Sequence, residues 1–257
     1  MDNIRLTFLG TGTSMGVPYI GCDCEVCRSS DPHDDRTRAS VLVDVGRTRL
    51  LIDAGPDFRR QMLRHTFRRI DGVLLTHIHY DHVGGIDDLR PFCQFGEVNV
   101  YGDSDTCRGL MRAIPYCFAE HRYPGAPRIH LHTIHSHHPL HIGEAEIMPI
   151  RVLHDRLPIL GFRIGRLAYI TDMKTISDKE LPYLEGVETL VVNALGFGGD
   201  HHSHQNVDDA IRFARLIGAR RTFLTHLSHR IGLHAESAAR LPADVRLAYD
   251  GLTIKQQ

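Results

Sequence analysis

The segment at residues 75–89, LTHIHYDHVGGIDDL, packs three histidines and one aspartate into six positions. The apolar residues before it predict a buried strand, and an extended chain would point His77 and His79 to the same side. A glycine pair after the cluster lets the backbone turn tightly. The pattern H-x-H-x-D-H therefore predicts a metal site at a strand end, where four ligands could hold one ion or two: His77, His79, Asp81 and His82.

Three further candidate ligands stand at the ends of other apolar runs in the chain. They are single residues that end or follow IMPIRVLH, LAYIT and TFLT, namely His154, Asp172 and His226. The repetition of this arrangement indicates one shared site. Five histidines and two aspartates suit two borderline cations such as zinc, with manganese or iron also suitable. Such a pair can activate a bridging hydroxide and clamp the oxygens of an in-line displacement, so the pattern predicts a hydrolytic site.

Composition excludes several classes of protein. The chain has 257 residues, 42% of them hydrophobic, which is enough for a core without disulfides. Its 30 basic and 31 acidic residues nearly cancel, so no overall basic character for nucleic acid is present. The N-terminus MDNIRLTFLG resembles no signal peptide, and no segment is apolar enough to span a membrane. We therefore expect a cytoplasmic protein whose cysteines bind metal or lie buried rather than form disulfides.

The order of strand-like and helix-like segments predicts stacked sheets. Strand patterns recur in two sets, at residues 4–10, 39–45, 48–54, 72–76 and 98–102, and at residues 145–154, 159–165, 166–171, 189–195 and 221–226. A helix pattern covers residues 56–67, with Phe58, Met62 and Leu63 on one stripe, and another begins at Asn206. A further helix is expected after the glycine pair, in IDDLRPF. No linker separates the two sets, so we expect one domain over residues 1–257.

A second cluster of metal-binding residue types lies in the N-terminal loop. GCDCEVC has the spacing C-x-C-x2-C, with Cys22, Cys24 and Cys27, and three thiolates require a fourth ligand for a tetrahedral site. The other cysteines have no such spacing, and we expect them to be small buried residues: Cys93, Cys107 and Cys117.

The string THIHYDH, followed in order by His154, Asp172 and His226, resembles the metallo-β-lactamase superfamily. The likeness extends from LTFLGTGTSMGVP through LLIDAGPDFRRQ to AYDGLTI, nearly the whole chain. It implies an α/β fold, a four-layer αββα sandwich, with a two-metal site at the strand ends. It also implies that one metal is held by His77, His79 and His154, that the other is held by Asp81, His82 and His226, and that Asp172 bridges them.

Asp53, in LLIDAG, matches an aspartate of this superfamily. Two roles are open for it. It could orient a ligand histidine through a hydrogen bond, or it could cap the turn from strand to helix.

The cysteine spacing is similar to that of one branch, the phosphoribosyl cyclic phosphate phosphodiesterases of the carbon-phosphorus lyase pathway. That resemblance implies that His229 completes a closed, structural zinc site. It also implies that a histidine two residues before a helix cap donates a proton to the leaving group. His204 has this position before Asn206, and His202 is the second candidate. The alternative is that either residue is a solvent-exposed loop histidine with no role in catalysis. Asp81 and His204 are thus the residues assigned to catalysis.

The resemblance implies a metal-dependent phosphodiesterase for small cyclic or nucleotide-like phosphodiesters, with two active-site cations, zinc or manganese, and one structural zinc. A tRNA 3′-processing ribonuclease stays open as a second function, although the chain has no Gly/Pro-rich basic arm. A lactonase, thioesterase or β-lactamase would leave the cysteine cluster without a role, and the complete ligand set disfavours an inactive binding module. We expect a small phosphodiester partner, no stable nucleic-acid partner and no membrane; homodimer formation is left open.

Overall fold

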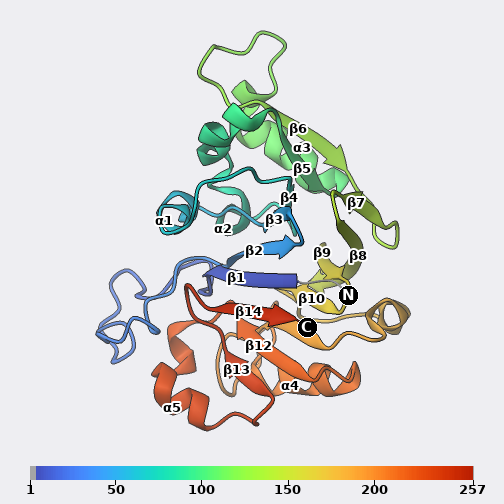
Figure 1. Cartoon of the computed structure of the whole chain (residues 1–257). Helices are drawn as coiled ribbons and strands as arrows, with labels where there is room; N and C mark the ends of the chain where they lie inside the picture. The colour runs from blue at the N-terminus through green and yellow to red at the C-terminus, as the bar shows by residue number, and fades with distance from the viewer. Residues whose placement is uncertain (1–3, 257) are drawn as a thin grey trace.

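The computed structural model describes residues 4–256, which form two seven-stranded sheets. The first sheet has the order β14-β1-β2-β3-β4-β5-β6, and the second has the order β13-β12-β11-β10-β9-β8-β7. Helices α1 to α3 lie outside the first sheet, and α4 and α5 lie outside the second (Figure 1). The fold is therefore the αββα sandwich that the sequence predicts.

The strands of the first sheet are β1 (Ile4–Gly10), β2 (Ser40–Val45), β3 (Thr48–Ile52), β4 (Gly72–Leu74), β5 (Val98–Gly102), β6 (Ile129–Thr133) and β14 (Thr253–Gln256). Those of the second are β7 (Leu140–Ile142), β8 (Ala145–His154), β9 (Leu157–Ile164), β10 (Leu167–Ile170), β11 (Thr189–Asn193), β12 (Arg221–Thr225) and β13 (Val245–Leu247). In each sheet one half is parallel, β3 to β6 in the first and β10 to β13 in the second.

The α-helices are α1 (Phe58–Met62), α2 (Tyr80–Val83), α3 (Ser104–Ala113), α4 (Val207–Leu216) and α5 (His234–Ala239). Short 3-10 helices connect them: η1 (Ile86–Phe95), η2 (Pro115–Cys117), η3 (Asp178–Leu184) and η4 (His229–Ile231). Within residues 4–256, no helix is both long enough and apolar enough to cross a bilayer.

Three apolar layers hold the sandwich together, because both faces of each sheet are buried. The middle layer joins the sheets, with Val43 of β2 and Phe162 of β9. Alternation along β2 turns Leu42 to the opposite face, where it belongs to the same layer as Phe58 of α1. Phe213 of α4 lies in the third layer, on the outer face of the second sheet. Strands buried on both faces read as nearly continuous apolar runs, which is why the sequence identifies them readily.

The predicted strands agree closely with the observed ones, but the first predicted helix does not. Residues 56–67 contain only the five-residue α1, and Leu63, expected on the buried stripe, is 71% exposed. A short helix is stable only where its apolar face packs on the protein, and here that packing ends near Met62. The helix expected in IDDLRPF is the 3-10 helix η1. It contains Pro91, which cannot donate the α-helical hydrogen bond.

Candidate metal centre

The predicted ligands converge at one edge of the sandwich, where several strands end. Their ligand atoms form two groups, each with all atoms within 4.8 Å of one another. The first group is His77, His79 and His154, and the second is Asp81, His82, Asp172 and His226. The structure thus brings together all seven residues from four separate segments, and it divides six of them between the two groups as the family resemblance implies.

Ring nitrogens and carboxylate oxygens point at one another within these groups. Nε2 of His77 lies 2.9 Å from Nδ1 of His79. Nε2 of His82 lies 3.1 Å from an oxygen of Asp81, and both Nε2 atoms of His82 and His226 are buried without a hydrogen-bond partner among residues 4–256. A buried polar atom without a partner is costly, and a cation held by these atoms would remove that cost. The donor set therefore fits a pair of divalent cations.

Asp172 lies between the two groups. One of its oxygens is 3.1 Å from Nε2 of His226, and the other is 3.4 Å from Nε2 of His82 and 3.8 Å from Nε2 of His77. Burial raises the pKa of Asp172, but the rings of His226 and His82 outweigh that effect and hold the pKa well below its usual value. Asp172 is therefore a carboxylate placed to contact both metal positions.

The structure resolves the two roles considered for Asp53. Its Oδ2 lies 2.7 Å from Nδ1 of His82, and its carboxylate accepts hydrogen bonds from the backbone N–H and the hydroxyl of Thr76, each at 2.8 Å. Helix α1 instead begins after Asp57, so Asp53 does not cap it. Asp53 orients His82 so that Nε2 faces the metal position, the usual arrangement behind a metal-binding histidine.

Protonation of His82 competes with metal binding. Burial lowers the pKa of His82, but the carboxylates of Asp172, Asp53 and Asp81 together raise the pKa well above its usual value. A cation must displace that proton before it can use Nε2, so metal affinity falls as the pH falls.

The buried threonines beside the ligands were not predicted from the sequence. A fully buried threonine precedes three of the ligands: Thr76, Thr171 and Thr225. The hydroxyl of Thr76 lies 3.0 Å from Nδ1 of His77, and that of Thr171 donates to Asp172 at 2.8 Å. The signal that could have revealed them is a threonine directly before His77, Asp172 and His226, each of which follows an apolar run.

The backbone is strained at this edge of the sandwich. Asp53, Asp172 and His226 have φ values of 61°, 57° and 55°, a left-handed conformation that residues other than glycine rarely adopt. Such strain concentrates at functional sites, where the surrounding structure holds the residue in place. Here it turns each side chain at the end of its strand toward the metal centre.

His204 lies against the ligands, whereas His202 does not. The ring of His204 is 4.6 Å from the ring of His154 and 5.0 Å from that of His226, and its Nδ1 is buried without a partner in the described chain. Burial, with the neighbouring His226, lowers the pKa of His204 to about 3. His202 is exposed. Asn206 begins α4 with a capping box, as the sequence predicts, and holds this loop at the helix start.

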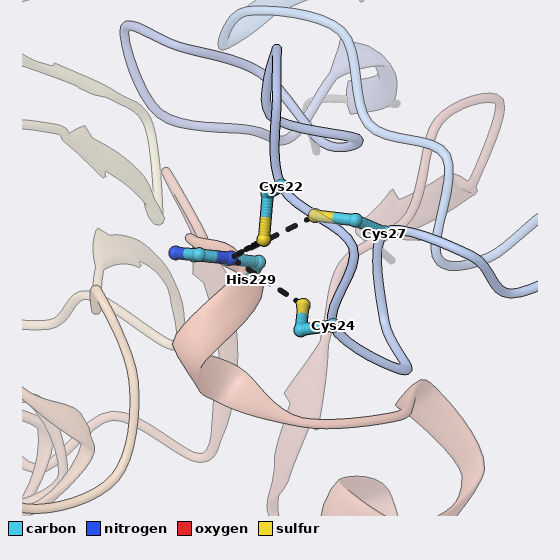
Figure 2. Close-up of side chains that lie close together, drawn as sticks. All are labelled: Cys22, Cys24, Cys27 and His229. Carbon is cyan, nitrogen blue, oxygen red and sulfur yellow. Dashed lines mark hydrogen bonds between the residues drawn. The ribbon is translucent and has the colours of Figure 1, made fainter.

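The cysteine loop meets His229 at a second cluster (Figure 2). Nδ1 of His229 lies 3.2 Å from Sγ of Cys22, 3.5 Å from that of Cys24 and 3.6 Å from that of Cys27. The backbone N–H of Cys27 helps lower the pKa of Cys24 to about 6, whereas burial raises the pKa of Cys27 to about 11. Three sulfurs and one ring nitrogen in this arrangement would suit a tetrahedral zinc ion, which binds cysteine as the thiolate.

Replacing Cys24 by serine should release one metal per chain and lower the melting temperature, because a structural metal contributes its binding energy to folding. Activity should fall less than stability, since His229 lies three residues beyond His226 and affects it only through the connecting backbone. Metal analysis and thermal unfolding measure both effects. Unchanged metal content and stability would show that the cluster is not a metal site.

The remaining cysteines and histidines lie elsewhere. All six cysteines are free, and Cys107 and Cys117 are buried as expected, but Cys93 is only partly buried. Cys93 lies in η1, and its sulfur accepts a hydrogen bond from the backbone N–H of Arg128, just before β6, at 3.2 Å. Among the histidines from His130 to His154, only His154 belongs to a candidate metal-binding group.

Comparison with known proteins gives one family model, two curated relatives and one similar solved structure. A family model described as a beta-lactamase superfamily domain matches residues 48–227. The chain is 43% identical over 251 residues to an octanoyltransferase of Porphyromonas gingivalis, covering 97% of this chain and 51% of that protein. It is 41% identical over 86 residues to a ribonuclease Z of Bradyrhizobium diazoefficiens, covering 33% of this chain and 23% of that protein. It therefore spans about half the length, or less, of these curated relatives.

Among solved structures, a diphosphatase from the PhnP family superimposes with a TM-score of 0.91 at 39% identity. The match covers 99% of this chain and 97% of that one.

Proposed function

This chain belongs to the beta-lactamase superfamily and, within it, to the PhnP family, and from that premise we propose that it is a metal-dependent phosphodiesterase. Its substrates are small cyclic or nucleotide-like phosphodiesters. The observation that carries the proposal is the pairing of two adjoining ligand groups with a histidine, His204, that lies against them and has a buried, unpartnered ring nitrogen.

The two ligand groups would hold two cations, zinc or manganese, with Asp172 shared between them. When bound, the cations supply Lewis acidity and activate water for attack on phosphorus. Asp81 remains ionised at neutral pH. Burial raises the pKa of Asp81, but the rings of His82 and His226 hold it well below its usual value. An ionised Asp81 can both hold a cation and accept a hydrogen bond from the attacking water.

His204 would supply the proton that the departing oxygen needs. Its ring lines a pocket of about 270 Å³ beside the metal centre, together with His226. In the free protein the low pKa of His204 keeps the ring neutral at neutral pH. A phosphodiester anion in the pocket would favour the protonated ring, because an opposite charge nearby stabilises the charged form.

The direct test is a substrate panel run on protein purified without an affinity tag, alongside metal analysis. The panel contains a chromogenic diester, nucleoside cyclic phosphates, an acyl ester and a precursor tRNA. We expect turnover of the diesters, its loss with a chelator, and its recovery when zinc or manganese is added. Full metal occupancy without activity on any phosphodiester would contradict the proposal and favour a binding module.

A second candidate function is 3′-processing of tRNA, which the similarity to ribonuclease Z favours. The formal net charge of −1 argues against it, because affinity for RNA depends on cationic contacts with phosphates. Cleavage of the precursor tRNA in the same panel, with an affinity that weakens as salt rises, would support this candidate instead.

A further inference from the structure

A groove runs between the two sheets at the edge where β13 and β14 are the outermost strands. In Figure 1, β14 lies across from β12 and β13, and these three strands line the groove together with α5 and the turn before β14. Its volume is about 510 Å³, within the range of small-molecule sites. Among the described residues that line it, none is a ligand of the metal centre or of the cysteine cluster. Any ligand of this groove would therefore bind apart from the hydrolytic site.

The floor of the groove is apolar. Phe223 of β12 belongs to the middle layer of the sandwich, and Leu252 and Ile254 pack against that layer from the side of the first sheet. Ile254 pairs with Leu6 of β1, so these two side chains share the inner face of that sheet. Both sheets thus present hydrocarbon to the groove, and an apolar chain lying there would be removed from water.

Arg246 of β13 points into the groove, because its neighbours along the strand face the other way. Val245 and Leu247 belong to the layer on the outer face of the second sheet, and side chains alternate along a strand. Arg246 pairs with Phe223 across the two strands, so both side chains lie on the inner face. The side chain of Arg246 is exposed and forms no ion pair within residues 4–256. Its guanidinium is therefore available to an anion above the apolar floor.

The charge that lines the groove is positive. Arg221, Arg246 and Lys255 contribute to the walls, with no aspartate or glutamate among the described lining residues. Arg221 links the two sheets, because its Nη2 donates to a threonine hydroxyl of β11 at 2.9 Å and to the carbonyl of Lys255 in β14 at 3.2 Å. Asp244, the acid next to β13 in sequence, is paired with Arg215. An anion in the groove would thus meet cations without competition from a lining carboxylate.

We propose that this groove is a second binding site, which takes an anionic amphiphile: a carboxylate with a medium-length hydrocarbon chain. The chain would lie along Phe223, Leu252 and Ile254, and the carboxylate would accept two parallel hydrogen bonds from Arg246. The apolar floor disfavours a purely hydrophilic anion, and the lining cations disfavour a cationic amphiphile. The proposal does not depend on the phosphodiesterase activity.

Isothermal titration calorimetry on the metal-loaded protein, at ligand concentrations below those that form micelles, tests both parts of the ligand. Hexanoate, octanoate and decanoate should bind with an affinity that rises roughly two- to fourfold per methylene, since each methylene leaves water. Decyltrimethylammonium has a chain of the same length as decanoate but the opposite charge, and it should bind at least about tenfold more weakly. Affinity that is independent of chain length, or equal for the two head groups, would overturn the proposal.

Replacement of Arg246 by glutamine should weaken decanoate binding by about tenfold or more, the size expected when a charged group loses its hydrogen bonds. Arg246→Lys should restore part of the loss, because it keeps the charge without the planar fork. The matched control is Arg112→Gln, since Arg112 is also exposed and forms no ion pair among the described residues, but lies on α3 and not in the groove. The control should bind decanoate as the parent does. Unchanged affinity in Arg246→Gln would contradict the assignment.

Carboxylates also bind metal ions, so the metal centre has its own control. Asp172→Asn should bind decanoate as tightly as the parent, and Arg246→Gln should keep the metal content of the parent. Binding that is lost in Asp172→Asn and kept in Arg246→Gln would place decanoate on the metal centre and refute the groove site. Sedimentation velocity at the same protein concentrations tests the other occupant, a second copy of the chain. A dimer to which decanoate does not bind would likewise refute the proposal.

Discussion

Replacement of Asp172 by alanine should release at least one active-site cation and remove nearly all activity while the fold persists. The carboxylate of Asp172 faces His226 of one ligand group and His77 of the other from its two oxygens, so its loss affects both metal positions. The effect should exceed the roughly 10–100-fold cost of losing a residue that only supports a ligand. The apolar layers of the sandwich do not depend on this side chain.

Metal analysis, turnover of a chromogenic diester and thermal unfolding provide the three measurements for Asp172. Because Asp172 has a positive φ, alanine there also strains the backbone, and Asp172→Asn is the matched control, since asparagine tolerates this conformation better. Both variants should lose metal and activity, and the asparagine variant should be the more stable. If both variants retain two active-site metals, Asp172 does not bridge them.

Replacement of His204 by alanine should keep both active-site metals and lower activity by roughly 10²–10⁴-fold, the range typical of general acid catalysis. The loss should depend on the leaving group. A leaving alkoxide or ribose oxygen is strongly basic and needs the proton, so the rate of cleavage of such a substrate should fall by the full factor. A nitrophenolate leaves without protonation and should be little affected.

His202→Ala is the matched control for His204, because His202 is in the same loop but exposed. It should retain nearly the activity of the parent on both kinds of substrate. Equal losses on both leaving groups in His204→Ala would instead indicate that His204 binds the phosphate and stabilises its charge. Absence of any loss would remove His204 from the reaction.

Hydrophobic patterning was sufficient to predict most of the sheet structure. Apolar runs such as β1 and β8 have the bounds expected from the sequence, because strands buried on both faces leave a continuous signal. The alternation HLH at residues 130–132 indicated the exposed face of β6, but strands β7, β13 and β14 were not predicted. These three strands are three or four residues long and lie at the edges of the two sheets. A segment so short has little hydrophobic pattern of its own, so its packing on the neighbouring strand stabilises it. The length of α1 was overestimated for the same reason.

The residue types of the candidate metal centre could be predicted from the sequence alone. Each ligand is a histidine or aspartate that ends or follows an apolar strand or stands in the H-x-H-x-D-H string, and both features are local. The cap at Asn206 is local as well, because its partner Asp209 is three residues away. A strand end can be recognised from the residues beside it, since the hydrophobic pattern stops there.

Only the tertiary structure decided how these residues are used. It placed Asp172 between the ligand groups, paired Asp53 with His82, and set His204 rather than His202 against the ligands. It also joined Cys22 to His229, 207 positions away in the chain. Such contacts depend on strand pairing and on the packing of two sheets. These bring together residues remote in sequence, and no local pattern encodes the distance between them.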